Sequence, residues 1–229
     1  MQFSHDRILT THAGSLPRPD YLVAILENHD QRDLEWTSDL EQRLARAVRE
    51  IVQKQSDTGI DVLNDGETGK VGYSTYVTER LTGFGDEHRG PGPMVEFGQF
   101  PEYYRDHPIG GGAIKRPVCT GLIAWRGTEQ VQRDIENLKD ALRNVNALEV
   151  FMTSASPGFI WYSMENDYYP SDEAYLFAAA EAMQQEYRAI ADAGFVLQLD
   201  CPDLAMGWNR YSSAGLTIED FRNISAMHV

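Results

Sequence analysis

The sequence has few cysteines, no long apolar run and no stretch of basic residues. Its two cysteines, Cys119 and Cys201, are too few for a disulfide scaffold, and their apolar, strand-like contexts favour a reducing compartment. No segment approaches the ~20 apolar residues of a membrane-spanning helix, and the N-terminus lacks the charged start and apolar core of a signal peptide. We therefore expect a cytoplasmic protein without a membrane partner.

Basic residues are outnumbered, with 20 Lys and Arg against 35 Asp and Glu, which gives a net charge of −15. An extended phosphate backbone would be repelled by such a chain, so we expect no nucleic-acid partner. Hydrophobic residues make up 42% of the 229 residues, which is enough for one buried core and does not demand two domains. The composition is typical of a soluble globular protein.

The clearest predicted element is a helix from about Thr37 to Thr58. Ser38 and Glu41 have the spacing of a capping box, and Gly59 is placed to end the helix. One face is apolar along its whole length and carries Leu40, Leu44, Ala47, Val48, Ile51 and Val52. A strand from Ile60 to Asn64 follows at once.

Strands and helices then alternate along the chain. Five strands are predicted near Leu9, Val62, Val118, Val150 and Leu197, the third of them over residues 117–124. Further helices are predicted to begin at Thr128, at Pro170 and at Thr217, the last with Asp220 three residues on. The helix from Pro170 ends at Gly194, and its predicted apolar face carries Leu176, Ala180, Met183, Tyr187 and Ile190. Such alternation favours a parallel sheet with right-handed crossovers. The predicted fold class is α/β, of the (β/α)8 TIM-barrel type, with only the first five or so of its eight strands present in one incomplete domain over residues 1–229. An open five-stranded sheet is the alternative.

Residues 71–116 interrupt this pattern with glycines, prolines and aromatic residues. A structureless loop of that length is improbable within a compact domain, so we expect a hairpin or an ordered excursion. It is a candidate lid over a binding site. A surface insertion packed by its own aromatic residues is at least as consistent with the composition.

Three segments run from an apolar stretch into polar groups: Ile8–Arg18, Asp61–Glu67 and Val196–Ala205. Polar groups at the C-terminal ends of strands are where α/β enzymes assemble their active sites. Glu67, Asp200, Ser15 and His12 are the candidate site residues in these segments. Each also has a structural interpretation, as a turn or cap group or as a buried group paired with the backbone.

The same segments carry a family resemblance. The motifs are Thr10-Thr-His-Ala-Gly-Ser-Leu-Pro-Arg-Pro19, Asn64-Asp-Gly-Glu67, Ser156-Pro-Gly158 and the run from Glu186 to Ala205. With them the chain resembles the catalytic barrel of cobalamin-independent methionine synthase and its smaller relatives, including the epoxyalkane:coenzyme M transferases. The resemblance implies an enzyme, a zinc-dependent S-alkyltransferase that transfers a methyl or other alkyl group to a thiol held as thiolate.

For the substrate, the resemblance implies that Ser15 and its neighbouring backbone hold the carboxylate of homocysteine. Glu67 and Asp200 would hold its amino group, since a partly desolvated ammonium needs compensating charge. His12 would orient the site. The methyl donor implied by the resemblance is a methyl-folate. Both substrates are small molecules.

For the metal, the family's zinc ligands are a His-x-Cys motif and a further Cys, which we expect C-terminal to Val229, beyond this apparently truncated chain. His228 precedes the expected motif, and we do not assign it as a ligand. His12, Cys119, Cys201 and Glu67 lie near strand ends, but no C-x-x-C or H-x-x-x-H spacing supports a local zinc site. We therefore assign no metal ligand.

Two other functions compete with methyl transfer to homocysteine, the methionine-forming reaction. One is an epoxyalkane:coenzyme M transferase-like reaction, although coenzyme M carries a sulfonate and no amino group for Glu67 and Asp200 to bind. The other is a truncated, metal-free, non-catalytic binding module. A part-barrel would expose sheet edges and apolar faces, so a homo-oligomer is possible.

Overall fold

The computed structural model describes residues 2–26, 37–70, 72–89, 98–106, 116–213 and 215–229. The chain forms two compact units that alternate along the sequence. The first comprises Met1–Leu81, Trp125–Ser154 and Met183–Leu199, and the second comprises Thr82–Ala124, Ala155–Ala182 and Asp200–Val229. Among the described residues we find no helix with the length and hydropathy that a membrane crossing requires.

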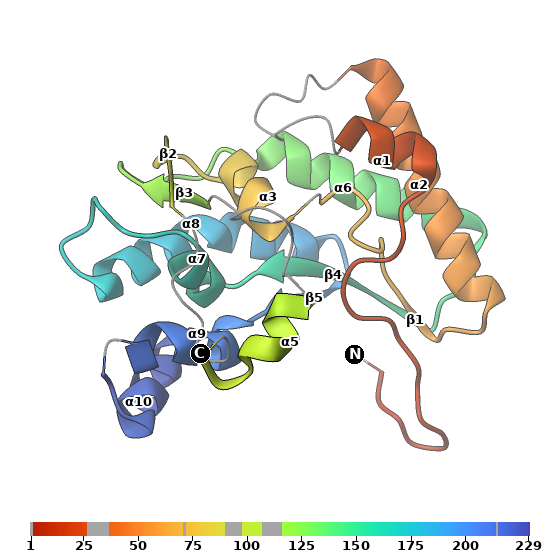
Figure 1. Cartoon of the computed structure of the whole chain (residues 1–229). Helices are drawn as coiled ribbons and strands as arrows, with labels where there is room; N and C mark the ends of the chain where they lie inside the picture. The colour runs from red at the N-terminus through yellow and green to blue at the C-terminus, as the bar shows by residue number, and fades with distance from the viewer. Residues whose placement is uncertain (1, 27–36, 71, 90–97, 107–115, 214) are drawn as a thin grey trace. The chain divides into compact units, whose positions relative to one another are not determined.

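The first unit is built on a three-stranded sheet in the order β1-β4-β5 (Figure 1). The strands are β1 (Val62–Leu63), β4 (Glu149–Ala155) and β5 (Val196–Asp200). β1 runs parallel to β4, with Val62 opposite Glu149 and Leu63 opposite Val150. The α/β fold class predicted from the alternation is thus confirmed.

The strand expected near Leu9 is reduced to a single parallel bridge between Thr11 and Val62. The reason lies in the hydrogen bonds of Thr10. Its amide donates to the carboxylate of Asp61 at 2.8 Å rather than to a strand carbonyl, so the ladder does not extend towards the N-terminus.

Helices of the first unit cover this sheet. They are α1 (Asp20–Leu26), α2 (Ser38–Asp57), α3 (Tyr73–Arg80) and α6 (Thr128–Ala141), which is followed by the 3₁₀ turn Leu142–Asn144. α2 and α6 pack against each other (Figure 1). The predicted apolar face of α2 is confirmed, because Leu40, Leu44, Ala47, Val48 and Val52 are buried and Ile51 is partly buried.

The cap of α2 differs from the prediction by one residue. Thr37 has an extended backbone, and its side chain accepts a hydrogen bond from the amide of Leu40 at 3.3 Å. Ser38 is already helical, so the predicted Ser38–Glu41 capping box was wrong.

Leucines and other apolar residues from α1, α2, α6, α8 and the sheet form one hydrophobic core in the first unit. Its buried members are Leu22, Leu26, Leu40, Leu44, Ala47, Val48, Val52, Leu63, Val131, Ile135, Leu138, Ala141, Met152 and Ile190. Full burial of such a side chain contributes roughly 1.5–3 kcal/mol. This core fixes the sheet whose ends carry the predicted site.

The second unit contains a two-stranded antiparallel sheet of β2 (Phe84–Arg89) and β3 (Arg116–Cys119). Its helices are α5 (Pro101–Asp106), α7 (Pro157–Ser163), α9 (Asp203–Ser213) and α10 (Ile218–His228), while α8 (Asp172–Asp192) contributes residues to both units. α1, α3, α5, α7 and α9 were not predicted from the sequence. The capping box of α10, formed by Thr217 and Asp220, agrees with the predicted helix start.

β3 corrects the prediction of a parallel strand over residues 117–124. It ends at Cys119 and pairs with β2, with Phe84 opposite Cys119. The chain then wraps closely around Gly83, whose carbonyl accepts hydrogen bonds from the amides of Thr120 and Gly121. A Cβ at Gly83 would lie 2.8 Å from the carbonyl oxygens of Gly121 and Leu122, so glycine permits this approach.

The predicted excursion at residues 71–116 holds α3, β2 and α5 in its described part. Residues 71, 90–97 and 107–115 of this segment lie outside the described residues. Its role as a lid stays a prediction.

Candidate functional site

The loop that follows β1 is polar and buried. Asn64, Asp65, Glu67, Thr68 and Lys70 are each at most 6% exposed. Buried polar groups need hydrogen-bond partners, and some of these partners lie within the loop itself. The side chain of Asn64 accepts from the amide of Gly66 at 2.6 Å, and that of Asp65 accepts from the amide of Glu67 at 2.9 Å. The loop is therefore a fixed structure at the C-terminal end of β1.

Glu67 is the candidate substrate-binding residue in this loop. Its backbone has a φ of 54°, and it is the one non-glycine residue with positive φ in the described chain. Its carboxylate accepts a hydrogen bond from the Ser15 hydroxyl at 2.6 Å, although 52 residues separate the two in sequence. The amide of Leu16 donates to the carbonyl of Gly66 at 3.0 Å and holds the two segments together. The structure thus unites two of the predicted site residues.

Two cations that were not predicted support this loop. The guanidinium of Arg18 donates to the carbonyls of Glu67, Thr68 and Lys70. The ammonium of Lys70 donates to the carbonyl and hydroxyl of Thr153, near the end of β4. Arg18 lies inside the recognised motif, but nothing in the sequence pattern indicates that its partners are carbonyls.

The backbone of His12 contacts this loop. Its carbonyl accepts a hydrogen bond from the Asn64 side-chain amide at 2.8 Å. The imidazole is partly buried, and its Nε2 atom has no hydrogen-bond partner among the described residues. A buried ring nitrogen of this kind is suited to a hydrogen bond with a bound ligand.

Asp200 is the last residue of β5, as the sequence predicted. Its carbonyl accepts a hydrogen bond from the amide of Ser156 at 3.1 Å. Asp200 belongs to the second unit, whereas Ser15 and Glu67 belong to the first. The convergence of Glu67 and Asp200 on one ammonium therefore stays a prediction.

A buried polar cluster in the second unit joins α7, α9 and α10. Ser156 caps α7 and donates to Asp203 at 3.1 Å, and the other carboxylate oxygen of Asp203 lies 2.8 Å from Nδ1 of His228. The ring of Trp161 meets His228 edge to face. The side chain of Asp203 therefore links three helices.

Both cysteine thiols are protonated at neutral pH in the metal-free chain. Burial raises the pKa of the Cys119 thiol to about 11, and burial is also the main cause that raises the pKa of Cys201. A thiol with a raised pKa is a poor nucleophile at neutral pH. Within the described part of the chain, no three His, Cys, Asp or Glu side chains are grouped to hold a metal ion. The described residues, His12 and Glu67 among them, therefore do not fit a zinc site.

A buried ionic network lies in the first unit and was not predicted. Nε of Arg80 donates to Glu186 at 3.0 Å, and its Nη2 pairs with Asp134 at 2.5 Å. Glu186 also accepts from the hydroxyls of Tyr76 and Ser154, each at 3.0 Å. The network ties α3, α6, α8 and β4 together, which suggests a structural role.

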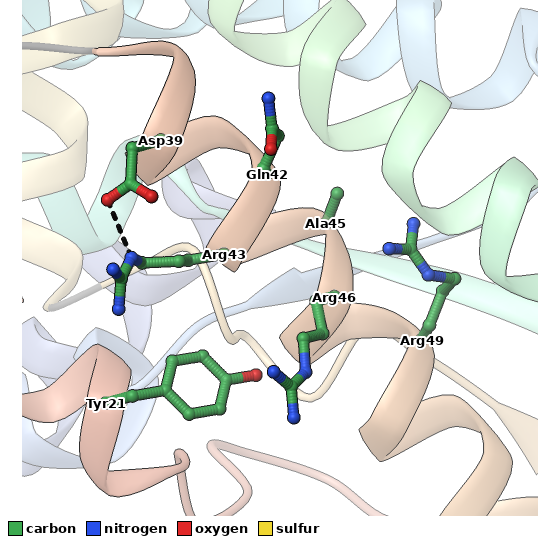
Figure 2. Close-up of a pocket in the computed structure, with 7 residues that line it drawn as sticks. All are labelled: Tyr21, Asp39, Gln42, Arg43, Ala45, Arg46 and Arg49. Atoms are coloured by element: carbon green, nitrogen blue, oxygen red, sulfur yellow. Dashed lines mark hydrogen bonds and ion pairs between the residues drawn. The ribbon is translucent and has the colours of Figure 1, made fainter.

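A separate hollow of about 600 Å³ lies in the first unit, beside α2 (Figure 2). Its lining residues are Tyr21, Asp39, Gln42, Arg43, Ala45, Arg46 and Arg49. Each arginine is paired with a carboxylate, Arg43 with Asp39, Arg46 with Glu50 and Arg49 with Asp140. Because these charges are compensated and the hollow contains none of the predicted site residues, we do not assign it a ligand.

Comparison with known proteins gives relatives in both sequence and structure. Methionine synthases of Saccharolobus solfataricus and Saccharolobus islandicus are 26% identical over 196 residues, which cover 85% of this chain and 53% of theirs. No protein-family model matches the chain.

Two solved structures share the fold. A B12-independent methionine synthase from Shewanella sp., in complex with selenomethionine, has a TM-score of 0.64 and 21% identity and covers 90% of this chain. A putative vitamin-B12 independent methionine synthase from Listeria monocytogenes has a TM-score of 0.56 and 23% identity and covers 85% of it. The matched regions are 55% and 53% of those two chains. The chain is therefore similar in sequence to methionine synthases and in fold to B12-independent methionine synthases, as its motifs predicted, and it spans about half the length of the curated relatives that it matches.

Proposed function

We propose that this chain takes part in a cobalamin-independent transfer of a methyl group to the thiol of homocysteine. The observation that carries the proposal is the hydrogen bond from the exposed Ser15 to the buried carboxylate of Glu67, in the loop that follows β1. This is the edge of the sheet where α/β enzymes bind their substrates. The sequence relatives named methionine synthase support the same reaction.

In this proposal Glu67 binds the ammonium group of the amino-acid thiol. A carboxylate has about four lone-pair sites, so Glu67 can accept from an ammonium while it accepts from Ser15. A charged pair in a water-poor site is favourable when both partners are hydrogen-bonded. Asp200 is the proposed second partner of that ammonium.

Ser15 and the neighbouring backbone bind the substrate carboxylate in this proposal, and His12 contributes its buried Nε2 atom to orient the ligand. The Ser15 hydroxyl can rotate between Glu67 and a ligand oxygen, because a hydroxyl is both donor and acceptor. We propose that both compact units belong to one (β/α) domain with this site, which acts in the cytoplasm on small molecules.

The family resemblance implies zinc, which would supply the thiolate by lowering the pKa of the bound thiol. Since the described residues do not fit a zinc site, their proposed tasks are to bind and orient the amino-acid thiol. The methyl donor implied by the resemblance is a methyl-folate.

Binding of L-homocysteine, measured by isothermal titration calorimetry under reducing conditions, tests the proposal. Glu67→Gln keeps the shape of the side chain but removes its charge, so we expect the dissociation constant to rise about tenfold or more. Glu50→Gln is the matched control, because Glu50 is a partly exposed carboxylate on α2 with its own arginine partner. It should bind as the unsubstituted protein does.

Coenzyme M is the comparison ligand in the same measurement. Its sulfonate would meet the negative charge of Glu67, so we expect it to bind more weakly than homocysteine. Tighter binding of coenzyme M would favour the epoxyalkane transferase reaction instead. Equal homocysteine binding by the protein and by Glu67→Gln would refute the assigned role of Glu67, and a chain that binds neither thiol would contradict the proposed function.

A further inference from the structure

Arg18 contacts the backbone of the Glu67 loop at three carbonyl groups. Nε donates to the carbonyl of Thr68 at 3.1 Å, and Nη2 donates to the carbonyl of Glu67 at 2.8 Å and to that of Lys70. Three carbonyl dipoles that point at one place repel one another, and a cation at that place stabilises them. The planar fork of a guanidinium can serve three such acceptors, which an ammonium on a flexible stem cannot do in the same geometry.

The loop needs this support because its backbone is unfavourable. Gly66 and Glu67 follow one another with φ values of 64° and 54°. Glycine adopts the left-handed region readily, but a side chain makes that conformation costly. Such residues persist only where their surroundings over-determine the conformation. For Glu67 the surroundings include the carbonyl contact with Arg18 and the side-chain contact with Ser15.

Lys70 anchors the end of the same loop to the sheet. Its side chain is buried, and its ammonium donates to the Thr153 hydroxyl at 3.2 Å and to the Thr153 carbonyl. The ammonium also lies over the ring of Tyr76, 5.2 Å from the ring centroid. Arg18 thus contacts three carbonyls of the loop, and Lys70 joins the end of the loop to β4.

We infer that Arg18 and Lys70 are positioning residues, which keep the Glu67 carboxylate preformed for the ammonium group of an amino-acid thiol. This inference rests on the proposed function, because it takes that ammonium as the partner of Glu67. The two cations act through the backbone of the loop, so the expected effect of changing them is a more mobile loop and weaker ligand binding. Preformed sites bind more tightly because less ordering accompanies binding.

Hydrogen–deuterium exchange of the peptide covering residues 64–70 tests the positioning directly, without a ligand. Arg18→Lys keeps the charge and removes the fork, so exchange of this peptide should become about tenfold faster. Arg43→Lys is the matched control, since Arg43 lies on α2 and contacts the side chain of Asp39. It should leave exchange at residues 64–70 unchanged.

Thr153→Val is the second variant and decides the matter if Arg18→Lys does not fold. It removes one acceptor of the Lys70 ammonium and leaves both cations in place, so we expect about threefold faster exchange in the same peptide. Homocysteine affinity, measured by calorimetry on the same preparations, should fall about tenfold in Arg18→Lys and about threefold in Thr153→Val.

Faster exchange together with weaker homocysteine binding supports the inference. Unchanged exchange at residues 64–70 in the folded variants overturns it, and so does faster exchange with undiminished homocysteine affinity. If the unsubstituted protein does not bind homocysteine, the proposed function fails, and the link to an amino-acid thiol fails with it. The exchange result then still decides whether the two cations fix the loop.

Discussion

The guanidinium of Arg80 donates to the carboxylate of Glu186 across 106 residues of sequence, at 3.0 Å, with both side chains 2% exposed. Burial by itself would lower the pKa of Arg80, but the carboxylates of Asp134 and Glu186 outweigh it and raise that pKa. The carboxylate of Glu186 also accepts hydrogen bonds from the hydroxyls of Tyr76 and Ser154. Removal of one partner from such a buried pair leaves the other charge uncompensated, which strongly destabilises the folded state.

Glu186→Gln should therefore destabilise the protein strongly. The substitution removes one negative charge from the buried network and leaves Arg80 with only part of its compensation, at a cost of about 3 kcal/mol. Urea denaturation at neutral pH measures the change in the free energy of unfolding. Glu50→Gln, on the surface of α2, should change it by less than about 0.5 kcal/mol. If Glu186→Gln changes the free energy of unfolding as little as Glu50→Gln does, the network adds no stability.

The carboxyl group of Glu79 should make stability fall between acidic and neutral pH. Burial is the main cause that raises its pKa to about 7, against an ordinary value of 4.5. Between these two values the unfolded chain has lost the proton that the folded chain keeps, so the free energy of unfolding decreases as pH rises through this range. Well above pH 7 the carboxyl group is ionised in both states, so its contribution to the free energy of unfolding no longer changes with pH.

Glu79→Gln isolates this effect, because it resembles the protonated carboxyl group and does not titrate. We expect the variant to match the unsubstituted protein near pH 4 and to exceed its free energy of unfolding at pH 8 by up to about 3 kcal/mol. Chemical denaturation at a series of pH values gives the comparison. Parallel stability curves for the two proteins would contradict a raised pKa at Glu79.

Gly158→Ala should destabilise the second unit, although alanine is the better helix former. A Cβ at this position in α7 would lie 2.2 Å from an oxygen of Asp203 and 2.7 Å from Nδ1 of His228. Both groups are buried and hydrogen-bonded to each other, so one of them has to move, at a cost of roughly 1–3 kcal/mol. Thermal unfolding measures the loss.

Gly98→Ala is the control for this substitution, since a Cβ at Gly98 has no neighbouring atom within 4 Å among the described residues. It should leave the melting temperature nearly unchanged. An equal effect of the two substitutions would show that the Asp203–His228 contact does not restrict α7.

Cys119 should react slowly with iodoacetamide in the folded protein. The side chain is buried, and burial raises its pKa to about 11, so at pH 8 it has roughly 100-fold less thiolate than an ordinary cysteine. Peptide mapping after timed alkylation measures the rate, with the urea-unfolded protein as the reference. A rate equal to that reference would mean that Cys119 is accessible and ionised.

The sequence predicted those features that depend on neighbours along the chain. Helical periodicity identified the apolar face of α2, and the spacing of Thr217 and Asp220 marked the start of α10. The motif segments also located Asp200 at the end of β5 and Glu67 in the loop that follows β1. Such signals are local, because a helix period or a capping bond involves residues only a few positions apart.

Tertiary packing decided the rest. It set the hydrogen bond between Ser15 and Glu67, the carbonyl contacts of Arg18, and the antiparallel partner of β3. It also buried the charged side chain of Glu186 on α8. Helical periodicity had instead predicted the next residue, Tyr187, on the buried face of that helix. These contacts join residues far apart in sequence, and their free energy depends on burial and on partners that exist only once the chain has folded.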